Sequence, residues 1–343
     1  MKLDADLLAA ARYDDRGVPV DGRDAEFAAL RTAGVRDLSA ARIFEGHLNG
    51  LGLVARFGTS AQRAAARLDA RTGRLFGVWN TQDDGGVRMT RDGDDVHLAG
   101  AKTWASGARF IQRPIVTATL PDGRSQMLVV PFDEISARID ASGWRPLGMH
   151  ASESVRVSFD GITLGASQLL GHPGDYQRDP WFSGGALRFV AVQSGALQRL
   201  VDETLRYLID RSRDGDPMQT ARVAEMQVGL QTAQLWIEHG IEAWKSFDDT
   251  PDSENAARAV DRADGARVAV ERAAFDLLER AMKAIGARGL IEPLPFAGLV
   301  RDLEMYLRQP APDAILQRVG RTAFAAARSA RIVGNAASTA TGA

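Results

Sequence analysis

Hydrophobic and polar positions follow three different patterns in successive stretches of the chain. In the first stretch, up to about residue 70, apolar side chains recur at spacings of three and four, at Ala41, Phe44, Leu48 and Leu51. This spacing predicts an amphipathic helix that begins after Asp37. Glycines at 46, 50 and 52 interrupt the segment, and each costs about 1 kcal/mol in a helix. Close packing against a neighbour, which we favour, or a bound ligand would explain them.

The second stretch, residues 75 to about 170, has a period of two. Apolar and polar residues alternate over 96–98 and 155–159, as expected of half-buried strands. Asp-Gly pairs at 92–93 and 122–123 predict hairpin turns, because both residue types tolerate positive φ. Several short strands joined by such turns indicate a compact sandwich or barrel.

The helical period returns at about residue 184 and continues almost to the C-terminus. It predicts helices from about 184 past Leu208, then over 220–244, 254–285, 296–308 and 314–335, with Gly286 as a C-cap. Long helices with short connections favour a bundle. We therefore expect an α+β fold with a short N-terminal helical domain (1–74), a middle β-barrel domain (75–170) and a C-terminal helical bundle (171–343).

Composition excludes several classes of protein. The 343 residues include 42 Lys+Arg and 44 Asp+Glu, a formal charge of −2, and no cysteine. Near-neutral charge argues against a nucleic-acid-binding protein, and the lack of cysteine excludes disulfides, thiolate metal sites and cysteine nucleophiles. No apolar run approaches the roughly 18 residues of a membrane span. The acidic N-terminus does not resemble a secretory signal, so we expect a cytoplasmic protein, without a metal site.

Common cofactor motifs are absent, since the chain has no GxGxxG after a strand, no P-loop and no HExxH. The informative run is 98–108, where Trp104 and Ser106 would project to one face of a strand. Trp79 and Thr81 repeat this pattern. An indole beside a hydroxyl can cover an aromatic cofactor and hydrogen-bond to its edge. Alternatively, the tryptophan fills the barrel core and the hydroxyl is solvated, and the pattern alone leaves both interpretations open.

Five segments, in order along the chain, carry a family resemblance. They are 77–86, 98–107, 144–152, 157–162 and 300–302. Together they resemble motifs of the acyl-CoA dehydrogenase family of flavoproteins, of which the second reads LxGxKxWxTxG and the last RxxRD. The resemblance implies an N-terminal helical domain, a β-barrel, a C-terminal four-helix bundle, and assembly into homodimers or homotetramers.

The resemblance also implies FAD between barrel and bundle. Around the isoalloxazine ring it places the backbone from Val78 onward and the side chains of Trp79, Thr81, Trp104 and Ser106. Arg211 resembles the arginine that meets the FAD pyrophosphate across the subunit interface, although Asp214 stands where the family has Phe. Alternatively, Arg211 is only a cation that stabilises a helix C-terminus.

Near the adenine end of FAD, the resemblance places a glycine loop that includes Gly286 and Gly289. The implied reaction is α,β-dehydrogenation of an acyl thioester on CoA or a carrier protein, with an electron-transfer partner. Alternatives are a flavin-dependent monooxygenase of the same fold and a non-catalytic FAD- or acyl-binding relative.

The chain departs from the family at the catalytic base. Most members carry a glutamate in the loop after the RxxRD helix, where this chain has Gln309 or Ala311, depending on the alignment. A subgroup places the base on an early bundle helix, and residues 185–188 contain no carboxylate there. Asp313 or Glu292 would then serve as the base, unless Asp313 is the N-cap of the last helix, a role that aspartate favours.

Overall fold

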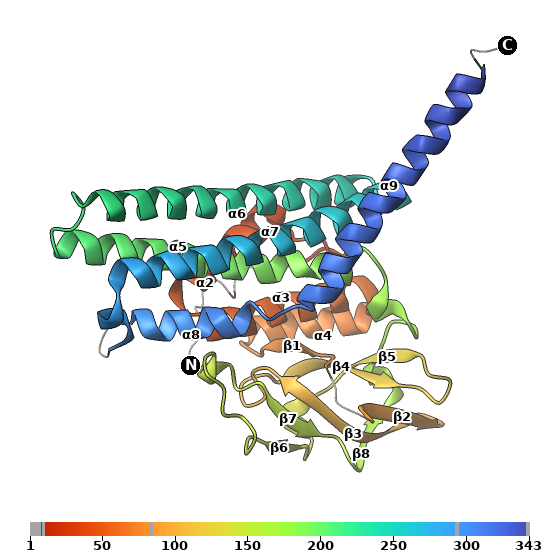
Figure 1. Ribbon diagram of the computed structural model, residues 1–343. Coiled ribbons are helices and arrows are strands. Elements are labelled where there is room, and N and C mark those ends of the chain that lie inside the picture. Colours follow the sequence, from red (N-terminus) through yellow and green to blue (C-terminus); the bar gives the residue numbers. More distant parts are fainter. Residues whose placement is uncertain (1–7, 9–10, 82–84, 292–294, 341–343) are drawn as a thin grey trace.

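The computed structural model describes residues 8, 11–81, 85–291 and 295–340, with side chains to residue 329. Helices stack in layers above one curved sheet, and α9 extends away from the other helices (Figure 1). All strands in the described part of the chain fall between Phe76 and Leu170. This arrangement confirms the expected α+β class.

In the described part of the chain, the helices before the sheet are α2 (Arg23–Arg36), α3 (Leu38–Phe57) and α4 (Ser60–Arg71). Asp37 begins α3 because its carboxylate accepts a hydrogen bond from the Ala40 N–H at 2.7 Å. A capping box between Thr59 and Gln62 begins α4. Buried side chains of α2 and α3 form one hydrophobic core with those of the C-terminal helices. The helices that precede the sheet in the sequence therefore pack together with those that follow it.

The described residues form the strands β1 (Phe76–Trp79), β2 (Val87–Asp92), β3 (Asp95–Ala105), β4 (Arg113–Thr119), β5 (Ser125–Val129), β6 (Arg138–Asp140), β7 (Val155–Ser158), β8 (Ile162–Gly165) and β9 (Leu169–Leu170). They pair in the order β6-β7-β3-β2-β4-β5-β9, with β1 beside β4 and β8 beside β3. The strands surround a second hydrophobic core. Gly93 and Gly123 lie in the connecting turns with φ of 58° and 84°, which confirms both predicted hairpins.

The C-terminal helices are α5 (Ala186–Asp210), α6 (Pro217–Asp249), α7 (Ser253–Ile285), α8 (Phe296–Tyr306) and α9 (Pro312–Ala340). Gly286 follows α7 with a φ of 74°, which confirms the predicted C-cap. Within the described residues, no helix is both long and apolar enough for a membrane crossing.

The glycines of α3 allow it to approach the sheet closely. A Cβ on Gly50 would lie 2.9 Å from the Phe76 Cβ at the start of β1, which is closer than packed carbon atoms allow. The side of α3 that carries Gly46 also faces β1, at Gly77. Close packing therefore accounts for these two glycines, as favoured from the sequence, and it places the start of β1 against α3.

Candidate functional site

Trp79 lies at the end of β1 and fills the core of the sheet. Its side chain is 1% exposed, meets Phe132 edge-on with ring centroids 4.9 Å apart, and donates from Nε1 to the Ser106 carbonyl at 3.0 Å. This placement matches the core-filling alternative of the sequence analysis, because the indole presents no free face to a ligand.

Trp104, at the end of β3, has the opposite environment. It is 46% exposed and lies edge-on to Trp144 at 6.0 Å. Ser106 is buried, and its hydroxyl lies 2.8 Å from that of Ser154. The expectation that Trp104 and Ser106 share a strand face is wrong. Trp104 has a φ of 55°, and the pairing of β3 with β7 shifts register between Lys102 and Ala105, so the two-residue period is broken there.

The backbone between Val78 and Thr81 runs off the end of β1 toward this indole. Thr81 is exposed, and its carbonyl accepts from the Thr103 N–H at 3.2 Å. Buried Lys102 holds the segment by donating to the Asn80 carbonyl and the Thr117 hydroxyl, each at 3.0 Å. Burial lowers the pKa of Lys102 to about 7. Residues 82–84 of the same motif lie outside the described residues.

Two of the family-like motifs meet in space. The Met149 N–H donates to the Asp302 carboxylate at 2.5 Å, joining the loop before β7 to α8. Burial raises the pKa of Asp302. A Cβ on Gly148 would overlap the Arg301 carbonyl oxygen, so only glycine allows the loop to pack this closely. The same loop carries Trp144, whose Nε1 donates to the His150 carbonyl at 3.0 Å.

A buried charged cluster lies between α3 and α5. The Glu45 carboxylate, 1% exposed, accepts from Arg42 at 2.8 Å and from Arg188 at 3.2 Å. Arg42 and Glu45 lie on α3, the helix whose Ile43 side chain packs near Gly107, just after β3. Glu45 is not among the acids predicted from the sequence, because the family's base positions and the two acids near the loop after the RxxRD helix, Asp313 and Glu292, lie far from it along the chain.

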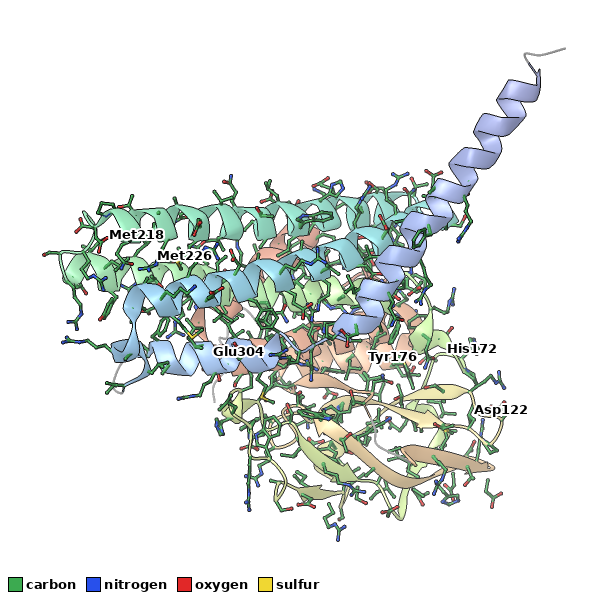
Figure 2. The ribbon with its side chains drawn as sticks, in the orientation of Figure 1. Asp122, His172, Tyr176, Met218, Met226 and Glu304 are labelled. Atoms are coloured by element: carbon green, nitrogen blue, oxygen red, sulfur yellow. The ribbon has the colours of Figure 1, made fainter. Side chains whose placement is uncertain are left out.

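Aromatic side chains surround the charged cluster. The Arg42 guanidinium lies 5.0 Å from the Phe189 ring, and Phe189 lies 5.9 Å from Tyr306 at the end of α8. The Tyr306 hydroxyl is buried and has no hydrogen-bond partner among the described residues, and burial raises its pKa. Tyr176 lies where the segment after the sheet meets the helices (Figure 2), and burial, with Glu45 nearby, raises its pKa to about 12.

The loop after α8 is held by two buried polar side chains. Gln193 donates to the carbonyls of Tyr306 and Gln309, each at 3.1 Å, and Arg267 donates to the Leu307 carbonyl at 2.7 Å. Residues 307–311 contain no carboxylate.

Neither of the two acids considered as bases from the sequence appears among the contacts of the Glu45 cluster or of the loop after α8. Asp313 is exposed in the first turn of α9, which begins at Pro312. The alternative that Asp313 is the N-cap is therefore wrong, because the residue already lies inside the helix. Glu292 lies outside the described residues.

Arg211 lines a cationic pocket of about 350 Å³ with Tyr207, Arg213 and Arg288. Its guanidinium lies 4.7 Å from the Tyr207 ring. Gly286 begins the turn that carries Arg288, and Gly289 packs against Ile285 and Phe296, where a Cβ would lie 2.6 Å from Ile285 Cγ2. Met218, near this pocket at the start of α6, lies at the opposite end of the helices from Tyr176 (Figure 2). The arginine pocket and the Glu45 cluster are therefore well separated within one chain.

Comparison with known proteins identifies the helical part of this arrangement. Residues 180–307, which include Arg188, Arg211, Asp302 and Tyr306, match the model for the acyl-CoA dehydrogenase C-terminal domain. In these helices the chain is similar to the acyl-CoA dehydrogenase family. This similarity agrees with the resemblance of the 144–152 and 300–302 motifs, which meet at Asp302.

Individual relatives are distant in sequence and similar in fold. The chain is 26% identical to a probable acyl-CoA dehydrogenase of Bacillus subtilis, YngJ, over 59% of this chain and 58% of that protein. It is 24% identical to a 3-sulfinopropanoyl-CoA desulfinase of Paraburkholderia xenovorans, over 76% and 70% of the two chains. The crystal structure of dibenzothiophene monooxygenase TdsC from Paenibacillus sp. A11-2 superposes with a TM-score of 0.82 at 22% identity, over 92% and 86% of the chains. The chain thus spans less than two thirds of the length of YngJ.

Proposed function

We propose that this protein is an FAD-dependent oxidoreductase that dehydrogenates the α,β bond of an acyl thioester. Three observations support the proposal: the match of residues 180–307 to the acyl-CoA dehydrogenase C-terminal domain, the exposed indole of Trp104, and a buried carboxylate on α3. The carboxylate of Glu45 is the observation on which the reaction depends, because α-proton removal requires a base.

The described residues offer suitable contacts for a flavin dinucleotide. The exposed face of Trp104 suits stacking on a flat aromatic ring. The Trp79 indole does not, because it is buried. The arginines at 211, 213 and 288 suit a pyrophosphate. An FMN-bound structure of TdsC is known, but a separate cationic pocket favours the longer FAD.

The separation of the two contact regions has a consequence for assembly. We infer that the Trp104 face of one chain and the arginine pocket of a second chain hold the same FAD. The protein would then act as a homo-oligomer. An electron-transfer partner would reoxidise it.

Side chains at the α3–α5–α8 junction provide the remaining chemistry. A bound flavin would supply the acceptor for the β-hydride. Glu45 would take the α-proton, and the buried Tyr306 hydroxyl would donate a hydrogen bond to a polar atom of the substrate. Such a donor in a site shielded from water stabilises developing negative charge on an oxygen. Arg42 and Arg188 would keep the Glu45 carboxylate in place.

Anaerobic flavin reduction tests this proposal. Butyryl-CoA and longer acyl-CoAs are added to the FAD-loaded protein, and loss of the flavin absorbance is followed. We expect the wild type and Asp313→Asn to bleach, and Glu45→Gln to keep its flavin and remain oxidised. Unfolding midpoints establish that Glu45→Gln is folded. Bleaching of Glu45→Gln, with none in Asp313→Asn, would instead assign the base to Asp313.

A second candidate function is flavin-dependent monooxygenation. The lack of a carboxylate in residues 307–311 favours it, because such chemistry needs no α-proton base at that loop. The superposition on TdsC shows that this fold also occurs in a monooxygenase. Oxygen-dependent product formation with chemically reduced flavin, without any bleaching by acyl-CoA, would establish this function and exclude the dehydrogenase.

A further inference from the structure

A large cavity lies on the side of α3 that carries Leu51 and Val54. Its volume is about 840 Å³, within the range typical of small-molecule sites. Leu51, Val54 and Ala66 form a buried apolar floor between α3 and α4. Residues between 11 and 20, with Ala11 and Tyr13 among them, complete the wall. Such a floor favours an apolar ligand group.

Arginines surround the cavity. Arg63, Arg67 and Arg71 lie four residues apart along α4, on one side of the helix, and Arg12 faces them from the preceding segment. Lining the same cavity, Asp14 is engaged in its own loop, where its carboxylate accepts from Arg16 at 3.1 Å and from the Val18 N–H at 2.9 Å. The lining therefore contains four arginines, and its one carboxylate is already bonded within its own loop.

These arginines are only partly neutralised. Arg63 and Arg67 share the single carboxylate of Asp15, at 3.5 and 2.5 Å, and Arg12 pairs with Asp21 at 2.9 Å. Among the described residues, Arg71 has no ion-pair or hydrogen-bond partner, and it is exposed. The rim thus retains positive charge beside an apolar interior.

We propose that this cavity is a second binding site, for a free amphiphilic anion such as a long-chain carboxylate. The apolar tail would occupy the floor of Leu51, Val54 and Ala66, and the anionic head would meet Arg67 and Arg71. The site is separate from the Glu45 cluster, which lies on the α5 side of α3. The inference is independent of the proposed dehydrogenation, because the residues that line the cavity do not include those of the cluster.

Direct binding to the full-length protein tests the proposal. Fluorescent cis-parinarate is displaced by hexanoate, octanoate, decanoate and dodecanoate. We expect saturable binding whose affinity rises about threefold to fourfold per methylene group, as burial of the chain requires. Dodecyltrimethylammonium, which has a like tail and a positive head, should displace the probe much more weakly. Equal affinity across the series, or no saturable binding, would overturn the proposal.

Variants locate the site. Arg71→Ala should weaken dodecanoate about threefold to fivefold, with a smaller difference at high salt. Ala70→Trp, at a half-buried lining position, should abolish binding by filling the cavity. Arg321→Ala, on exposed α9, is the matched control and should bind normally. Tyr306→Phe should also bind normally, whereas a loss confined to Tyr306→Phe would place the ligand in the candidate active site and refute the second site.

A vesicle experiment separates free ligand from lipid surface. Co-sedimentation with anionic phosphatidylglycerol vesicles is compared for the wild type and Arg71→Ala. We expect no sedimentation of either protein. If the wild type sediments with the vesicles and Arg71→Ala does not, the arginines bind a membrane headgroup, contrary to the proposal. Retained flavin in all variants, read from the absorbance spectrum, shows that the fold is intact.

Discussion

Substitution of Gly148 by alanine directly tests the junction between the 144–152 loop and α8. The new Cβ would overlap the Arg301 carbonyl oxygen and lie 2.6 Å from the Asp302 backbone nitrogen. Both atoms belong to the backbone of α8, so no side-chain rotation relieves the overlap. The loop must withdraw by roughly 1 Å to restore ordinary contact distances.

The size of the effect follows from the hydrogen bond at this junction. The Met149 N–H to Asp302 carboxylate distance of 2.5 Å would lengthen to about 3.5 Å, beyond a normal hydrogen bond. Loss of a hydrogen bond to a charged group costs about 1.5–3 kcal/mol. Trp144 moves with the loop, and its edge contact with Trp104 is worth about 0.5–1.5 kcal/mol. Loss of the hydrogen bond should lower the free energy of unfolding by about 1.5–3 kcal/mol. Loss of the contact that positions Trp104 should weaken flavin binding about threefold to tenfold.

Urea unfolding and flavin titration measure the two effects. Gly143→Ala is the matched control, because the same segment carries Gly143 and no atom lies within 4 Å of its added Cβ. It should change stability by less than about 0.5 kcal/mol. Equal stability and flavin affinity in the two variants would refute the argument that Gly148 is required for this contact.

Three further predictions follow from buried groups and the arginine pocket. Burial lowers the pKa of His47 to about 4. Because the unfolded chain binds this proton near pH 6.5, stability should fall by up to about 1.4 kcal/mol per pH unit from pH 6.5 down to 4. His47→Gln should lose this dependence in urea midpoints. Arg211→Gln should weaken FAD about tenfold and leave FMN affinity unchanged in fluorescence titrations; equal losses would place Arg211 elsewhere. Gln193→Leu should free residues 307–311, raising their cleavage rate in limited proteolysis.

The sequence predicted the repeating parts of the fold well. Alternation over 96–98, the Asp-Gly turns and the cap at Gly286 are local signals, and each appears in the structure. Order along the chain was also informative, since two of the five motifs meet at the Met149–Asp302 contact. Such features depend on neighbours in the sequence or on family order, which a single chain displays.

Other features could not be predicted from the sequence, because they depend on local backbone geometry or on contacts between residues far apart in the chain. The left-handed backbone at Trp104 broke the two-residue period, and no residue type marked it, since tryptophan rarely adopts positive φ. Glu45 is an acid within an apolar helix, but its partner Arg188 lies far along the chain. A charged residue at an otherwise apolar helical position was the available signal. The site remains a prediction for Val78, Thr81, Trp104 and the arginine pocket.

The environment of α3 sets how freely its sequence can vary. Most of its 20 residues are buried, since the sheet, α5 and α4 each cover a different side of it. A saturation-mutagenesis map should therefore show intolerance along nearly its whole length, without the permissive stripe of an ordinary surface helix. Among proteins whose α3 is buried in this way, differences in substrate preference should then be concentrated in flanking segments such as 307–311. Substitutions there do not alter the contacts of α3 with the sheet, α4 and α5.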